Sequence, residues 1–193
     1  MANLGQGQYF NVGQSGDAIA ITTPFDKKMA MLSKKLDETR MHYGTEEELK
    51  LQRKKDRATK KLHRSASPAS QARRAEFNLQ KSGKINRLGK NELVDDVSSG
   101  KVDLDSIDKR ALPEAIRVMP KEEQLKTIQE QATIRHSIMG EMKKLSEKRN
   151  DYIRNKMKDS ASAEVSLDEK LYKTIRQQAA EKGLKYKSDS AAY

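Results

Sequence analysis

Residues 120–158 read PKEEQLKTIQEQATIRHSIMGEMKKLSEKRNDYIRNKMK, and this stretch decides the fold class. Pro120 suits the first turn of a helix, and Glu122 and Glu123 follow it at the positive end of the helix dipole. Apolar residues then recur at mixed steps of three and four, which is the spacing of one helix face. The members of this seam are Leu125, Ile128, Ala132, Ile138, Met142, Leu145, Tyr152 and Ile153. The stretch predicts one long helix with a narrow apolar seam.

A narrow seam of this kind is typical of a helix that packs against another helix, as in a coiled coil. The simplest partner is a helix of the same chain. Arg135 and Arg149 interrupt the seam, which favours an antiparallel hairpin over a long zipper between two copies. An assembly that oligomerises through residues 125–153 stays open as a further interpretation.

Working outward, the chain before this stretch predicts shorter helices. Thr23-Pro24 supplies an N-cap and a first-turn proline, and the helix it opens is expected to end at Gly44. A capping box at residues 45–48 starts a second helix, and Pro68 predicts a break near Ser67. The remaining elements are a third helix over residues 69–81, a turn region over residues 81–89, a short helix over residues 91–99, and a last helix from the capping box at residues 166–169 to Gly183.

The first 22 residues differ in character from the rest of the chain. Residues 8–12, QYFNV, have the pattern of a short strand, with glycines on both sides. Such a strand cannot form a stable sheet by itself. We therefore expect Tyr9, Phe10 and Val12 to bind a partner by adding a strand to the edge of its sheet.

These elements predict a mainly α fold, an elongated helical hairpin or bundle with long coiled-coil-like helices and a short N-terminal β segment. The composition agrees, because 35% apolar and 5% aromatic residues leave little material for a large compact core. The expected organisation is residues 1–22 as strand and linker, residues 23–186 as the helical region and residues 187–193 as a disordered tail.

Composition also excludes several classes of protein. No apolar run approaches the roughly 20 residues that a membrane-spanning helix needs. The first 16 residues lack the basic and apolar regions of a secretory signal. The absence of cysteine excludes disulfides and thiolate chemistry. We expect no membrane span and, by default, a cytoplasmic location.

The net charge of +11 is concentrated in one third of the chain. Residues 26–90 contain 19 basic and 8 acidic residues, so they carry the whole excess. Such a stripe is either a solvated helix face or a surface for phosphates, anionic lipids or an acidic protein. Its densest part is Lys50–Arg74, and because no aromatic residue occurs from Lys50 until Phe77, nucleic acid would bind there through phosphates alone and with strong salt dependence. The candidate anion-binding residues are Arg53, Lys54, Lys55, Arg57, Lys60, Lys61, Arg64, Arg73 and Arg74.

The sequence lacks motifs for catalysis, cofactors and metals. His42, His63 and His136 lie far apart, and exposed helix positions suit them better than a shared metal site. The carboxylates of residues 103–108 lack the glycine and distal glutamate of a calcium loop, so loop and capping roles suit them. No phosphate-binding loop or nucleophile elbow is present. We predict no catalytic, cofactor-binding or metal-ligating residue, and a protein that is not an enzyme.

Short motifs are spread along nearly the whole chain. Residues 4–12 read LGQGQYFNV and residues 21–26 read ITTPFD. Further motifs are Leu36-Asp37-Glu38-Thr39, His42-Tyr43-Gly44, Asn91-Glu92-Leu93-Val94-Asp95, Leu112-Pro113-Glu114, Arg135-x-x-Ile138 and the closing Leu167-Asp168…Ile175-Arg176-x-Gln178-Ala179…Gly183. Together they resemble the C-terminal part of bacterial proteins with a von Willebrand factor type A domain, in which a helical extension follows the domain's last strand. Asn91 stands where that family's pattern has tryptophan.

This resemblance implies that residues 1–22 are the last strand and linker of an A domain, and that residues 23–186 are its helical extension. A complete A domain binds a divalent metal through Asp-x-Ser-x-Ser. The nearest match here, residues 96–100, reads DVSSG and ends in glycine. The resemblance therefore does not bring metal-dependent ligand binding to this chain.

The sequence as a whole predicts a non-enzymatic protein-interaction or scaffold module without a cofactor. Its partner would be another protein, for example the rest of an A-domain protein or a member of a complex. The alternative is a basic nucleic-acid- or ribosome-associated helical protein that binds phosphates through residues 50–74. The sequence leaves open the identity of the partner and whether the chain forms a homo-oligomer.

Overall fold

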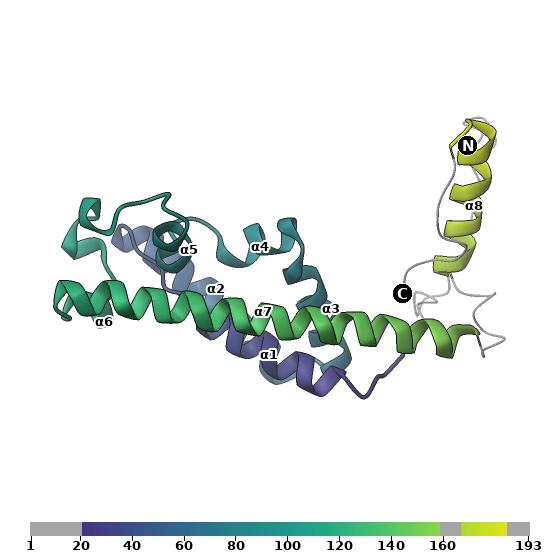
Figure 1. Cartoon of the computed structure of the whole chain (residues 1–193), viewed down its shortest axis with the longest axis horizontal. Coiled ribbons are helices and arrows are strands. Elements are labelled where there is room, and N and C mark those ends of the chain that lie inside the picture. Colours follow the sequence, from purple (N-terminus) through teal and green to yellow (C-terminus); the bar gives the residue numbers. More distant parts are fainter. Residues whose placement is uncertain (1–20, 159–166, 185–193) are drawn as a thin grey trace. The chain divides into compact units, whose positions relative to one another are not determined.

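The computed structural model describes residues 21–158 and 167–184, and they confirm the predicted mainly α fold class. The chain divides into two compact units, Pro24–Glu147 and a second that combines Met1–Thr23 with Lys148–Tyr193. The elements of the first unit (Figure 1) are α1 (Asp26–Glu38), α2 (Glu46–Ser65), α3 (Pro68–Leu79), α4 (Lys81–Leu88), α5 (Leu93–Ser98), α6 (Glu114–Arg117) and the first part of α7 (Lys121–Lys158), with short 3-10 turns at Leu104–Ser106 and Lys109–Ala111.

The long helix α7 organises this unit, because two separate apolar clusters form along it. In the first cluster, α1 and α3 pack against the middle of α7. Alanines on α3 bring the helices close, since interhelical distance depends on the side chains at the contact. Its buried members are Met29, Leu32, Leu36, Ala72, Ala75, Ile138 and Met142. Ile138 and Met142 of the apolar seam thus pack, as expected, against helices of the same chain, whereas Leu125 is 43% exposed.

The second cluster covers the first turns of α7. It gathers apolar side chains from α5, the 3-10 segments and α6 around Ile128, which is completely buried. Its buried members are Leu93, Leu104, Leu112, Ile116 and Ile128, with Met41, Tyr43, Val97, Ile107 and Met119 packed against them. Short, irregular elements therefore share one core through their contact with a single long helix.

A buried ion pair lies between these two clusters. The guanidinium of Arg135 on α7 donates two hydrogen bonds to the carboxylate of Glu92, at 2.8 and 2.9 Å. Their side chains are only 7% and 2% exposed. Arg135 also donates to the Thr39 hydroxyl and to its carbonyl, at 3.1 and 2.9 Å. The arginine that interrupts the apolar seam is thus a joint of four hydrogen bonds between α7, the end of α1 and the start of α5.

The same ion pair explains why α1 is shorter than predicted. The helix begins at Asp26, after a turn at residues 24–25, and ends at Glu38 instead of continuing to Gly44. Glu92 accepts a hydrogen bond from the Met41 amide at 2.9 Å, and His42 forms an antiparallel bridge with Glu92. These contacts hold residues 40–43 in an extended conformation. The Lys28–Glu141 ion pair at the other end of α1 shows that α1 runs antiparallel to α7.

The prediction of a turn over residues 81–89 was wrong, because α4 occupies Lys81–Leu88. Within α4, Gly83 is needed for close packing against α3. A Cβ atom at this position would lie 1.8 Å from the carbonyl oxygen of Phe77 at the end of α3. Only glycine allows α4 to start directly against α3.

Several predicted helix boundaries are confirmed. Thr45 and Glu48 form the reciprocal capping box of α2. The break near Pro68 separates α2 from α3, and Ser67 caps α3 by accepting a hydrogen bond from the Ser70 amide. In the second unit, α8 (Leu167–Glu181) is followed by a turn at Gly183, whose amide donates to the Ala180 carbonyl at 3.0 Å.

Some predictions lie outside the described residues. They are the strand at residues 8–12 with Tyr9, Phe10 and Val12, the cap at Ser166 and the tail at residues 187–193. The absence of a membrane span is supported for the residues that are described: none of their helices combines the length and apolar character needed to cross a bilayer.

Candidate functional site

Helix α2 carries the predicted basic stripe on its outer side. No residue of α2 is buried when its backbone and side chain are counted together. Basic residues at positions 50, 54, 57, 61 and 64 are four and three residues apart, so they align along one helix face. Two further basic residues flank this row. We call this surface the basic face; it consists of Lys50, Arg53, Lys54, Arg57, Lys60, Lys61 and Arg64. With a rise of about 1.5 Å per residue it is about 21 Å long.

The charges of the basic face are largely unneutralised. All seven side chains are exposed. Arg53 pairs with Glu46 one turn before the row begins, and the other six make no ion pair with any residue that the structure describes. Closely spaced like charges on one helix repel each other, which weakly destabilises the helix. The same charges create a positive potential that attracts an anionic partner.

The inner side of α2 attaches to the unit through polar groups. Gln52, Asp56, Thr59 and His63 are four, three and four residues apart, on the side opposite the basic face. The Gln52 amide donates to the Lys90 carbonyl at 3.4 Å, and Asp56 pairs with Arg40 at 3.0 Å. A helix held by specific polar contacts keeps a fixed rotation about its axis, so the basic face has a defined direction.

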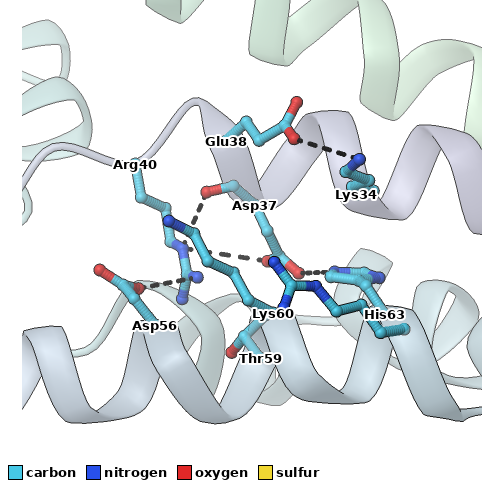
Figure 2. Close-up of a pocket in the computed structure, with 9 residues that line it drawn as sticks. Lys34, Asp37, Glu38, Arg40, Asp56, Thr59, Lys60 and His63 are labelled. Atoms are coloured by element: carbon cyan, nitrogen blue, oxygen red, sulfur yellow. Dashed lines mark hydrogen bonds and ion pairs between the residues drawn. The ribbon is translucent and has the colours of Figure 1, made fainter.

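Asp37, in the last turn of α1, is the centre of this attachment (Figure 2). Its Oδ2 atom accepts hydrogen bonds from Arg74 at 2.7 Å and from Nε2 of His63 at 2.8 Å, and the side chain is 5% exposed. Burial by itself would raise the pKa of this carboxyl. The hydrogen bond and charge of Arg74, together with Arg40 and His63, hold its pKa below the usual value. Asp37 therefore stays ionised and ties α2 to α1 and α3.

His63 is fully engaged in this network. Its Nδ1 atom lies 3.1 Å from Oε1 of Gln71, whose amide nitrogen donates to the carbonyls of His63 and Ala66. Because that nitrogen faces two acceptors, the amide oxygen faces Nδ1 of the imidazole. The prediction of an exposed histidine was wrong here, since the side chain is only 6% exposed. With both nitrogens occupied, His63 positions α2 and is not free to act as a base.

An opening of about 470 Å³ between α1 and α2 exposes one edge of this network (Figure 2). Most of its charged groups pair with one another, as in Lys34 with Glu38 and Arg40 with Asp56, whereas Lys60 and Arg64 of the basic face do not. No serine or cysteine lines it beside a base. The lining residues are Lys34, Asp37, Glu38, Arg40, Asp56, Thr59, Lys60, His63 and Arg64. The opening has the chemistry of a structural joint, and Lys60 and Arg64 connect its rim to the basic face.

The structure separates the nine candidate anion-binding residues into groups. Six of them belong to the basic face, which Lys50 joins as a member that the candidate set left out. Lys55 lies on the flank of α2, and Arg73 is exposed on α3. Arg74 turns inward, where its guanidinium binds Asp37. The sequence of α2 contains two opposite helical rows, one basic and one polar, but it does not show which row faces inward.

A second pocket, of about 590 Å³, lies beside the basic face; apolar atoms contribute most of its lining surface, although most of the lining residues are polar or charged. It extends from the flank of α2 to the segment that follows α4. Leu51 is 67% exposed and lines the pocket together with Ala58. Lys54, Lys55 and Lys90 also line it, and Lys54 belongs to the basic face as well. We call this the Leu51 pocket; it is continuous with the basic face.

The far wall of the Leu51 pocket is fixed by hydrogen bonds. Asn91 donates to Glu48 at 3.1 Å, and the Tyr43 hydroxyl donates to Asp96 at 3.1 Å. Burial and this carboxylate raise the pKa of Tyr43 to about 12. Gly89 has a φ of +70°, a conformation that glycine adopts readily, and it lets the chain turn next to Gln52. The pocket is therefore preformed.

The other sequence candidates for chemistry have structural roles. His42 is partly buried at the bridge to Glu92, and burial lowers its pKa. Asp103 and Asp108 cap the two 3-10 turns, as expected, by accepting hydrogen bonds from the amides of Asp105 and Arg110. Among residues 21–158 and 167–184, no group of three or more histidine or acidic side chains is arranged to hold a metal ion.

Comparison of the chain with known protein families, with curated proteins and with solved structures finds no match.

Proposed function

We propose that this protein is a non-enzymatic interaction module that binds an acidic partner protein through the basic face of α2. The observation that carries the proposal is the contrast between the two sides of that helix. The inner side is used in hydrogen bonds and ion pairs to α1 and to the α4–α5 segment. The outer side presents six exposed cations that pair with nothing in the described part of the chain.

The resemblance to the helical extension of A-domain proteins is part of this proposal. What supports it is the position of the motif residues. Asp37, Thr39, Glu92 and Arg135 all fall within the resembling motifs, and they form the buried polar contacts that hold the unit together. An open reading frame upstream of Met1 with an in-frame Asp-x-Ser-x-Ser motif would support this part, and its absence would count against it.

The N-terminal strand is a second proposed contact. Tyr9, Phe10 and Val12 would pair with a sheet edge of the partner by strand addition. Deletion of residues 1–16 should then weaken binding of the partner. Unchanged affinity after the deletion would remove this contact from the proposal and leave the basic face as the whole binding surface.

Charge reversal on α2 tests the main proposal. In the full-length chain, Lys54, Arg57 and Lys61 are replaced by glutamate. The matched control replaces the exposed Lys126, Lys143 and Lys144 of α7, which changes the net charge equally on another helix. Binding is measured by fluorescence anisotropy with labelled polyglutamate and with a labelled DNA duplex of about 20 base pairs. We expect the α2 variant to lose binding of polyglutamate and the control to retain most of it.

The same titration separates the protein partner from nucleic acid. Strong binding of the duplex, with an affinity that falls steeply and linearly on a log–log plot against salt, would favour the phosphate-binding alternative. Equal loss in both variants would show that net charge, and no particular face, controls binding. Either result would overturn an acidic protein as the partner of the basic face.

A further inference from the structure

We infer that the partner is an acidic amphipathic helix that inserts apolar side chains into the Leu51 pocket while its carboxylates meet the basic face. This inference rests on the proposed function of the basic face and specifies the chemistry of the partner. It combines two surfaces of unlike character that share Lys54. A partner that satisfies both must itself carry apolar and acidic groups side by side.

The apolar part of the argument starts from Leu51. A single exposed leucine on a protein surface is common and needs no explanation. Leu51, however, stands at the mouth of a preformed pocket whose volume of about 590 Å³ is within the range of ligand-binding pockets, roughly 300–1,000 Å³. Ala58 lies two helical turns further along the same flank. An amphipathic helix presents apolar residues at the matching spacing of three, four and seven.

The electrostatic part of the argument selects an acidic helix. Lys54, Lys55 and Lys90 line the pocket, and the rest of the basic face continues from Lys54 along α2. The one acidic residue of the pocket lining, Glu48, is already bonded to Asn91 and to the amide of Thr45. Carboxylates next to the apolar anchor would therefore meet uncompensated ammonium groups.

The same features disfavour a nucleic-acid backbone at this place. A phosphate backbone has no apolar group to fill the pocket, and single-stranded bases bind by stacking on exposed aromatic rings. The aromatic residue of the pocket lining, Tyr43, packs against the second apolar cluster and bonds to Asp96. The pocket thus adds specificity for an apolar side chain, which a protein partner supplies.

The test uses the full-length chain and a designed helical peptide of about 20 residues with leucine at helical spacing and glutamate on both flanks. A matched peptide has serine in place of each leucine and the same charge. The variant Leu51→Ser removes the apolar side chain at the mouth of the pocket, and Val118→Ser is the control, because Val118 is 74% exposed and lies outside the pocket. Unfolding by urea confirms that each variant folds as the wild type does.

We expect Leu51→Ser to lower the binding affinity for the leucine peptide roughly tenfold or more, because a buried contact between two apolar side chains is lost. Leu51→Ser should leave the binding of polyglutamate and of the serine peptide unchanged. Val118→Ser should leave the binding of all three probes unchanged. If the α2 charge reversal abolishes peptide binding while Leu51→Ser does not, the basic face stands and the inference fails. If neither the α2 charge reversal nor Leu51→Ser changes peptide binding, both the proposed function and the inference fail. Concentration-dependent dimerisation that Leu51→Ser abolishes would make a second copy the occupant and overturn the inference.

Discussion

Arg135 and Arg87 are buried arginines of the same unit, and they differ in what surrounds their guanidinium groups. Their residues are 6% and 4% exposed. Arg135 donates four hydrogen bonds, two of them to Glu92. None of the three side-chain nitrogens of Arg87 meets an acceptor among the described residues. Burial, followed by the charge of Arg135, lowers the pKa of Arg87 to about 10.

This difference shows that a buried charge stabilises a fold only through its partners. Moving an ion out of water costs roughly several kcal/mol. This cost is offset only where hydrogen-bond acceptors and an opposite charge surround the ion in good geometry. Arg135 meets this condition and joins three segments of the chain. Arg87 does not, so its burial is a cost that the apolar contacts of α4 must offset. Similar residues at similar depth should therefore respond oppositely to substitution.

The largest effect is expected for Arg135→Met. The substitution leaves the carboxylate of Glu92 buried without its cation, which typically costs about 3–5 kcal/mol. It also frees the Thr39 carbonyl and loosens the end of α1. Urea denaturation at pH 7 measures the loss of unfolding free energy. A loss below about 1 kcal/mol would contradict the contrast drawn between Arg135 and Arg87, because it would mean that the hydrogen bonds of Arg135 contribute little to stability.

Asp37→Asn tests the same principle on a buried anion. It removes the charge that Arg74 and His63 face, and we expect a loss of about 2 kcal/mol at pH 7. The folded-state pKa of Asp37 is lowered, so its contribution is complete above the unfolded value of 3.8 and is lost as pH falls below it. The difference between wild type and variant should therefore shrink in acid. A pH-independent difference would contradict the assignment.

Arg87→Met is expected to have the opposite sign from Arg135→Met. No acceptor among the described residues loses a partner when the side chain of Arg87 is removed. An apolar chain of similar length suits the site better than an unpaired cation. Unfolding free energy should stay unchanged or rise, by up to about 2 kcal/mol. A loss of more than about 1 kcal/mol in the same urea titration would show that Arg87 has a partner after all.

The apolar pattern predicted the parts of this unit that depend on apolar packing. The seam of residues 120–158 predicted α7, and the face of Met29, Leu32 and Leu36 predicted the side of α1 that is buried. Capping signals located the starts of α2 and α3. These features are local, so a single segment contains the information.

The features that the sequence did not predict depend on contacts between distant segments. The early end of α1 results from Glu92 and Arg135, which lie more than 50 and 90 residues away in the chain. Helix α4 was not predicted because the packing of Gly83 against Phe77 is invisible in the sequence. The inward row of Gln52, Asp56 and His63 consists of residue types that are usually exposed. The position of the basic residues could be read from the chain, but the direction in which they face could not.

The smallest effect is expected for charge reversal of Lys54, Arg57 and Lys61, and it extends the comparison to exposed cations. These side chains have no described partner to lose, so unfolding free energy at physiological salt should change by less than about 0.5 kcal/mol. At low salt, neighbouring like charges on α2 repel, and replacing three of them with glutamate converts most of these pairs into attractive ones. Added salt should therefore stabilise the wild type more than the variant. Urea titrations at low and high salt measure this difference. A large loss of stability at every salt concentration would mean that the basic face belongs to the framework of the fold, together with Arg135, and is not a surface kept free for a partner.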